Sequence, residues 1–334
     1  MIRLKLSAVV SASVFFAAAF IVSQTFADWT QLPLPNLADV FSPTAVANLP
    51  DGRYIFANEG NYYLEDYFGS PNYTAYSNTA PGNNADPSFI AVWDSTHAVA
   101  GGGTFGPSDL YSFNPSSATS PTFTANGLSL QNYSGVYRDA NSLYVGGLNG
   151  TGSTHAISYV DLSTETTKVI IDDVSTYSAG FARDAAGNLY VGDEDNGDVY
   201  EFTATQLNAA ITGSALSITN GTLIHQFDNG LGSVAVDSQG RIWSAGFAVN
   251  GLEVYDPSTG LQTDVIPGLT NANYMVTSFS VGSQGYVAYV DETNPGQAGT
   301  PQYYGFESVP EPGTFGLAAV GFVALAVCRR KQHG

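Results

Sequence analysis

The chain has 334 residues, a formal net charge of −19 and one cysteine, Cys328. Residues 28–308 hold 28 of the 29 acidic residues but only five basic ones, which gives this region a net charge of −23. This composition excludes disulfides, thiol catalysis and cysteine-ligated metal sites there, and it predicts repulsion from nucleic acids and anionic lipid surfaces.

The first 27 residues are predicted to be a secretory signal peptide with an apolar signal helix. Arg3 and Lys5 precede an apolar run from Leu6 to Val22, and Ala27 is the small residue expected at a cleavage site. Because the run approaches the length of a short membrane span, an uncleaved anchor is the alternative.

Residues 28–308 are predicted to form one domain built from a repeat. In most copies an apolar strand ends in Asp, a short step leads to Gly or Asn, and a second apolar strand follows; one copy has Gly282 in place of the Asp, and another has His97 in place of the Gly. An Asp side chain can accept a hydrogen bond from the backbone ahead of it and Gly tolerates a positive φ, so each copy predicts a β-hairpin. The marker positions lie 43, 45, 45, 53 and 45 residues apart, at Asp51, Asp94, Asp139, Asp184, Asp237 and Gly282.

Two further strands follow most of these hairpins, and four strands in 40 to 50 residues are typical of a β-propeller blade. The sequence therefore predicts an all-β fold, a β-propeller of six four-stranded blades, with seven or five blades as alternatives and a pair of β-sandwiches as the rival fold. Only Thr205–Ala210 indicates a helical turn or two. The hairpin of residues 232–257 resembles those of the NHL, SMP-30 and YVTN propellers, whereas residues 42–127 match that pattern poorly.

The densest acidic segment is a candidate calcium site. Asp193, Asp195 and Asp198 alternate around Asn196-Gly197, and Ca²⁺ prefers several oxygen ligands. The segment is not an EF-hand, because Ala204 stands where the twelfth-position Glu would be. Asn-Gly is also a common hairpin turn, so a plain turn is the alternative, and no other cofactor is predicted.

Catalysis finds little support in the sequence. The resemblance to SMP-30 and gluconolactonase propellers implies Glu, Asn and Asp around a central metal, for which Glu59, Asn141, Asp184 and Asp237 are candidates. Asp139, Asp184 and Asp237 recur at one repeat position, however, which favours a structural role. None of the four histidines has a metal-ligand spacing. No catalytic residue is predicted, and the non-enzymatic interpretation is favoured.

The last 26 residues, 309–334, carry three features in a fixed order. They are a short motif, an apolar stretch from Phe315 to Cys328 predicted to form a transmembrane helix, and a basic end that the positive-inside rule keeps in the cytoplasm. The motif is Val309-Pro310-Glu311-Pro312, and the basic end is Arg329-Arg330-Lys331.

This tail resembles the PEP-CTERM sorting signal of Gram-negative bacteria. The resemblance implies an exported precursor anchored in the inner membrane, recognition and cleavage by an exosortase, and transfer to the cell surface or extracellular matrix. A plain C-terminal membrane anchor is the alternative.

Three functions remain open from the sequence. The first is a non-enzymatic surface or matrix protein whose propeller binds or displays a polysaccharide or surface protein; Tyr62, Tyr63 and Tyr73 are among the aromatic residues that would suit a glycan, unless they pack inside the strands. The second is a secreted, metal-dependent hydrolase of the SMP-30/gluconolactonase type. The third is a periplasmic partner-binding module whose tail is never processed.

Overall fold

The computed structural model describes the repeat region in segments. They are residues 29–31, 45–58, 61–65, 73–77, 87–101, 107–117, 124–128, 130–148, 154–175, 180–227, 231–246, 252–264, 274–281, 286–293 and 302–308. The predicted signal peptide and the predicted C-terminal helix lie outside them. Within these segments, no helix combines the length and apolarity that crossing a membrane requires.

The described strands form six sheets, which we number as blades 1 to 6 in chain order. Blade 1 consists of β2 (Ala45–Asn48), β3 (Tyr54–Asn58), β4 (Asn61–Glu65) and β5 (Tyr73–Ser77). Blade 2 consists of β6 (Phe89–Asp94), β7 (His97–Gly101), β8 (Leu110–Phe113) and β9 (Thr124–Ala125). Blade 3 contains β10 (Ser134–Asp139), β11 (Ser142–Leu148), β12 (His155–Asp161) and β13 (Thr166–Asp172). Blade 4 consists of β14 (Phe181–Arg183), β15 (Leu189–Asp193), β16 (Asp198–Phe202) and β18 (Thr222–Gln226). Blade 5 consists of β19 (Leu231–Val236), β20 (Ile242–Gly246), β21 (Leu252–Asp256) and β22 (Leu261–Asp264). Blade 6 consists of β23 (Tyr274–Val281), β24 (Tyr286–Thr293), β25 (Gln302–Ser308) and β1 (Trp29–Gln31).

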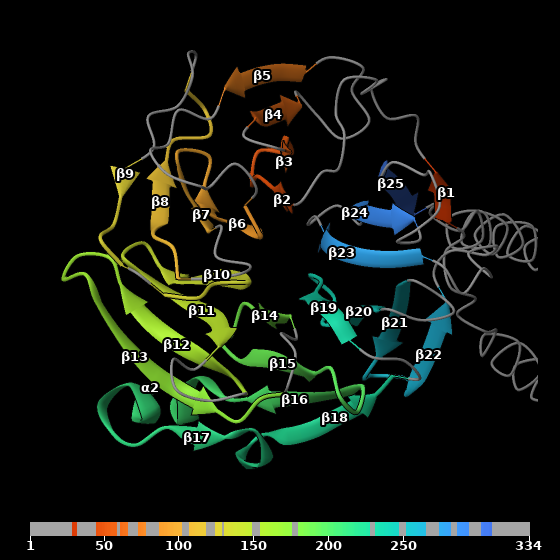
Figure 1. The fold of residues 1–334 in the computed structure, drawn as a ribbon. Coiled ribbons are helices and arrows are strands. Elements are labelled where there is room, and N and C mark those ends of the chain that lie inside the picture. Colours follow the sequence, from red (N-terminus) through yellow and green to blue (C-terminus); the bar gives the residue numbers. More distant parts are fainter. Residues whose placement is uncertain are drawn as a thin grey trace, which may run out of the picture. The chain divides into compact units, whose positions relative to one another are not determined.

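The blades follow one another around a ring, as Figure 1 shows. The first strand of each blade contacts the first strand of the next, from β2 through β6, β10, β14, β19 and β23 and back to β2. These six strands therefore surround the central axis. The predicted β-propeller is confirmed, with six sheets among the described residues.

The ring closes by pairing the two ends of the repeat region. Strand β1 lies antiparallel to β25, with Trp29 opposite Ser308 and Gln31 opposite Phe306. Blade 6 thus takes three strands from the end of the region and its outermost strand from the beginning.

Blade 4 carries an insertion between β16 and β18, which explains the single gap of 53 residues between markers. The insertion contains helix α2 (Ala204–Thr212), strand β17 (Leu216–Ser217) and the 3₁₀ turn η1 (Ile218–Asn220). The sequence indicated one or two turns at Thr205–Ala210, and the structure has a longer helix.

A capping box starts helix α2: the Thr203 hydroxyl accepts from the backbone N–H of Gln206, whose side chain accepts from the Thr203 N–H. At its other end Lys168 Nζ donates to the carbonyls of Ile211 and Gly213, at 2.8 and 2.6 Å. Strand β17 pairs in parallel with β13, so blade 3 gains a fifth strand and its outer edge is covered.

The apolar core lies in layers between neighbouring blades. One cluster joins blades 1 and 2, another joins blades 2 and 3, and a third joins blade 3 to blade 4 and its helix. Glycines permit the close approach: the Phe89 ring of blade 2 lies against Gly135 of blade 3, where a side chain would collide with it. Tyr62 and Tyr63 are buried in this core, so strand packing, not glycan contact, is the right interpretation for these two.

Candidate functional site

The marker aspartates are turn residues in every blade where the structure describes them. The Asp94 carboxylate accepts the backbone N–H of Thr96 at 2.7 Å, and Asp139 accepts that of Asn141 at 3.0 Å. Hydrogen bonds from Thr96, first from its backbone, lower the pKa of Asp94 to about 2. This is the predicted Asp-led hairpin turn.

The same role accounts for the candidates taken from the hydrolase resemblance. Asp184 accepts the backbone N–H of Asn188 at 2.8 Å and its side-chain amide at 3.0 Å. Asp237 accepts from the Arg241 Nε at 2.6 Å and the Trp243 indole at 3.0 Å. Glu59 lies outside the described residues. The described candidates thus stabilise separate hairpins, and no contact between them forms a shared site.

The candidate calcium residues form the turn between β15 and β16. Asp193 is 7% exposed, and its carboxylate accepts the backbone N–H of Asp195 at 3.0 Å and the side-chain amide of Asn196 at 2.7 Å. Gly197 has φ of 75°, which favours glycine. Asp198 accepts from the Tyr200 hydroxyl at 3.1 Å.

This geometry is that of a hydrogen-bonded hairpin turn. In the part of the chain that the structure describes, no three His, Cys, Asp or Glu side chains form a group able to hold a metal ion. Calcium binding at Asp193, Asp195 and Asp198 stays a prediction from the sequence, and the turn explains the same residues.

Glu194, in the same turn, offers a test of the local electrostatics. Burial, reinforced by the charges of Asp195 and Asp193, raises the pKa of Glu194 from 4.5 to about 7. A carboxyl with a raised folded pKa binds more protons when folded, so its favourable contribution is complete below about pH 4.5 and is lost as the pH rises through 7.

We expect Glu194→Gln to raise the free energy of unfolding at pH 8 by about 1 kcal/mol, after allowing for the partial exposure of the side chain. At pH 4.5 the two proteins should differ little. Urea unfolding at both values measures this, with the exposed Glu165→Gln as control. An equal gain at both values, or none at pH 8, contradicts the assignment.

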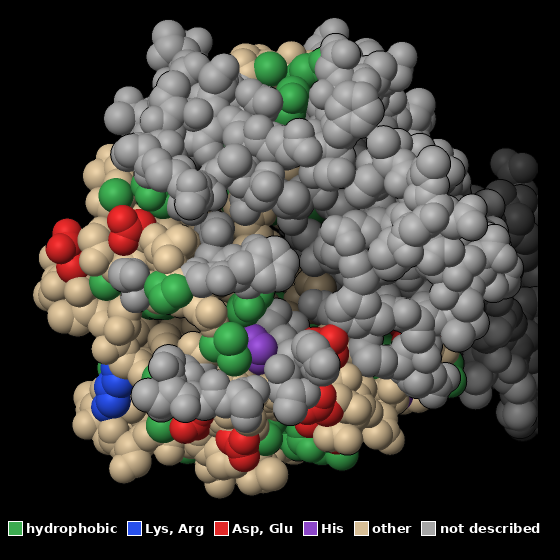
Figure 2. All heavy atoms as spheres, viewed as in Figure 1, with side chains coloured by type: hydrophobic (Ala, Val, Ile, Leu, Met, Phe, Trp, Pro, Cys, Tyr) green, Lys and Arg blue, Asp and Glu red, His purple; other side chains and the backbone are tan. Residues whose placement is uncertain are grey.

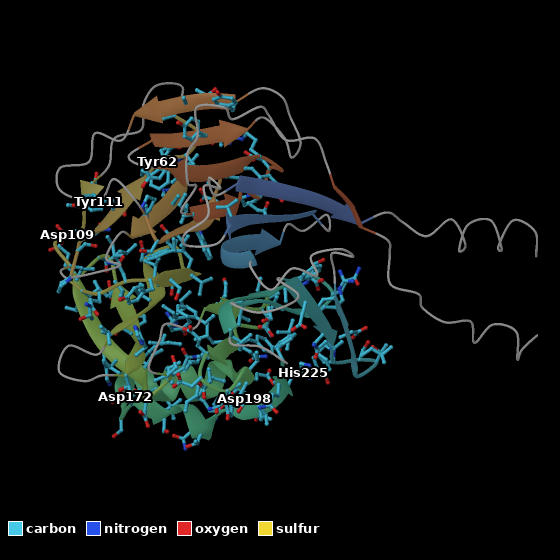
Figure 3. The ribbon with its side chains drawn as sticks, turned by 45° about the vertical axis from the view of Figure 1, so that its right-hand side comes forward. Tyr62, Asp109, Tyr111, Asp172, Asp198 and His225 are labelled. Carbon is cyan, nitrogen blue, oxygen red and sulfur yellow. The ribbon has the colours of Figure 1, made fainter. Side chains whose placement is uncertain are left out.

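The histidines that the structure describes have structural contacts. His225, on β18, stacks on Tyr255 of blade 5 with ring centroids 3.8 Å apart, and its Nε2 lies 2.5 Å from Oε1 of Gln262. Figure 3 shows His225 and Asp198 on neighbouring strands of blade 4. His225 therefore joins blades 4 and 5 at their outer strands.

Two arginines that the sequence reasoning passed over lie where blades 3 and 4 meet, at what we call the blade 3–4 seam. Arg138 is the next-to-last residue of β10, and Arg183 ends β14. Arg138 Nη1 donates to Asp139 at 2.5 Å, and its Nη2 donates to Asn208 of α2 at 3.1 Å. Arg183 is half-buried, and its Nε is buried without a hydrogen-bond partner among the described residues.

A comparison of the repeats residue by residue could have found this pair. Each arginine stands immediately before a marker aspartate, where three other copies have Pro50, Trp93 and Val236. The position is therefore not fixed by the repeat, unlike the aspartate that follows it.

The surface reflects the acidic composition. Figure 2 shows acidic side chains over the described part of this face, while basic ones gather at one place near β13 and α2. A cation on the propeller is consequently a rare feature.

Among the comparisons with known proteins, the family match covers only the C-terminal segment of the chain. Residues 308–331 match the PEP-CTERM protein-sorting motif. No curated protein matches the chain.

Among solved structures, the chain is similar to regucalcin, a calcium-binding protein from Agrobacterium tumefaciens, with 14% identity over 86% of this chain and 97% of that one and a TM-score of 0.55. It is similar to a luciferin-regenerating enzyme, with 13% identity, 84% and 96% coverage and a TM-score of 0.58. A pyrroloquinoline-quinone-bound aldose sugar dehydrogenase from Streptomyces coelicolor has 12% identity, 84% and 98% coverage and a TM-score of 0.54.

At these identities the likenesses show the fold alone, and they confirm the predicted propeller. The motif match confirms the predicted sorting signal and implies an exported, membrane-anchored precursor that an exosortase processes. The chain thus carries a PEP-CTERM protein-sorting motif at residues 308–331, following a β-propeller.

Proposed function

We propose that this protein is exported, cleaved at its C-terminal motif by an exosortase, and held at the cell surface or in the extracellular matrix. There the propeller acts as a non-enzymatic binding or display module for a surface ligand, a polysaccharide or a surface protein. The observation that carries the proposal is the match of residues 308–331 to the sorting motif.

The boundaries of the folded region support a propeller that is separate from the two segments removed by processing. Strand β1 begins at Trp29, two residues after the predicted cleavage site at Ala27, and β25 ends at Ser308, just before the Val309-Pro310-Glu311-Pro312 motif. Both processing steps would therefore spare every strand of the ring. The cysteine-free, acidic composition of the region suits a soluble exported body.

The hydrolase alternative gains no support from the geometry. The described carboxylates that the resemblance offered for a central metal, Asp184 and Asp237, belong to separate turns. The fold that this chain shares with enzymes is compatible with many functions.

Cells that contain or lack the exosortase test the proposal. We expect the intact mass of the protein to show loss of the C-terminal segment only where the exosortase is present, with the product at the surface or in the matrix. Glu311→Ala should leave a full-length, membrane-bound chain, whereas Glu307→Ala, just upstream of the matched residues, should be processed normally. A full-length chain in both kinds of cell would refute the sorting proposal.

A further inference from the structure

The two strands that close the ring bring the ends of the repeat region together (Figure 1). Strand β1 lies antiparallel to β25, and its first residue, Trp29, is the Cα partner of Ser308, the last residue of β25. Paired Cα atoms of antiparallel strands lie about 4.5–5.5 Å apart. The chain therefore enters and leaves the ring at one point on blade 6.

Other blades join the corresponding strands with a short loop. In blade 5 the four residues 257–260 connect β21 to β22, and Asp256 pairs with Leu261 across the turn. Blade 3 connects β12 to β13 in the same way with the four residues 162–165. In blade 6 the third and fourth strands, β25 and β1, come from opposite ends of the repeat region. Their pairing is that of a hairpin that has no connecting loop.

Processing as proposed above would create two new chain ends at this point. Cleavage after Ala27 leaves Asp28 with a free α-amino group, one residue before the paired Trp29. Cleavage within or directly after the Val309-Pro310-Glu311-Pro312 motif leaves one to four residues beyond Ser308. Asp28 plus those one to four residues would make a connection of two to five residues, the usual length of a hairpin loop.

The α-amino group of Asp28 is also the amine of the processed chain that is best placed to react. Lys168 is the only lysine in residues 28–308, and its Nζ donates to the carbonyls of Ile211 and Gly213 beside helix α2. A group tethered by a short link reaches an effective concentration of about millimolar order at its target. The β1–β25 pairing gives the Asp28 amine this advantage over amines that must diffuse to the motif.

We propose that the exosortase transfers the acyl group released at the motif to the α-amino group of Asp28 and so makes the propeller circular. The peptide bond at the motif breaks, and a new peptide bond forms to the Asp28 nitrogen. The proton that this nitrogen loses goes to the amine of the departing C-terminal segment. One peptide bond replaces another, so the exchange consumes no water, oxidant or reductant. The joining rests on the proposed export and cleavage, and it adds the acceptor of the cleaved chain.

A circular chain would suit a protein held outside the cell. Chain termini are where fraying and proteolysis concentrate, and β1 is both a terminal strand and the outermost strand of its blade. A loop between β25 and β1 would remove both termini and keep β1 in place.

The intact mass of the mature protein from cells that contain the exosortase tests the joining. We expect a mass lower by one water molecule than that of the linear product, and a peptide that reads from Ser308 through motif residues into Asp28-Trp29. A linear processed chain, or one joined to another acceptor, would overturn the joining and leave the sorting proposal intact. A full-length chain would refute both.

A longer tether provides the second test. About ten Gly-Ser residues inserted between Asp28 and Trp29 leave the strand and the residue after the signal-peptide cleavage site unchanged. The ratio of circular to linear product should fall about fivefold, because effective concentration falls roughly as the −3/2 power of linker length. The same insertion between Ser258 and Thr259, in the β21–β22 turn, is the matched control and should leave the ratio unchanged. Equal ratios for the two insertions would overturn the role of the paired ends.

Discussion

Trp243→Ala is expected to lower the free energy of unfolding by about 3–5 kcal/mol, the range for removing a large aromatic side chain from a core. Trp243 is fully buried at 0% exposure on β20, the second strand of blade 5. The substitution removes the ring and also the indole N–H that donates to Asp237 at 3.0 Å. The side chain therefore contributes both packing and turn stability.

Trp243→Phe separates the two contributions. It keeps most of the apolar volume but loses the hydrogen bond to the Asp237 carboxylate, which should cost about 1.5–3 kcal/mol. Urea unfolding followed by circular dichroism measures both variants, and the melting temperature of Trp243→Ala should fall by on the order of 10 °C. Loss below 1 kcal/mol for Trp243→Ala would show that blade 5 does not depend on this residue.

Gly147→Ala is the second substitution with a large expected effect. An added Cβ at Gly147 would collide with the carbonyl oxygen of Gln131 and lie 2.5 Å from its carbonyl carbon. These are backbone atoms, so no change of rotamer relieves the contact and the chain leading into β10 must move. We expect a loss of about 3 kcal/mol, the upper end of the usual range for overpacking.

Gly240→Ala provides the matched control for Gly147→Ala. Gly240 lies in the marker turn of blade 5 with φ of 77°, and a Cβ there would meet nothing within 4 Å. Its cost should be about 1–2 kcal/mol, from backbone strain alone. Chemical denaturation compares the two. If Gly147→Ala costs no more than Gly240→Ala, the close approach of Gln131 does not restrict this position.

The parts of the fold that could be predicted from sequence are those encoded locally. Asp94 and Asp237 lead turns in which the carboxylate accepts backbone N–H groups two to four residues ahead, so the pattern is visible within one hairpin. The helix at Ala204–Thr212 is local as well, and its capping box at Thr203 and Gln206 fits within four residues.

Features that depend on distant segments were harder to predict. The pairing of β1 with β25 joins the two ends of the repeat region. The sequence of the short β1 segment does not indicate which strand it pairs with. Arg138 was missed for the same reason, because its partner Asn208 lies on the helix inserted into the neighbouring blade. The turn at Asp193 was ambiguous, since alternating acidic residues around Asn-Gly suit both a calcium loop and a hydrogen-bonded hairpin.

Blade 6 can close only after the whole repeat region has been synthesised, because it takes strands from both ends of that region. Trp29 pairs with Ser308, a partner 279 positions later, so the first strand of the region to be made waits for the last. A chain that stops before Gln302 leaves β1 unpaired and the ring open at an exposed strand edge, which invites aggregation and degradation. Because the sorting motif directly follows β25, a chain that carries the motif also carries the strand that closes the ring.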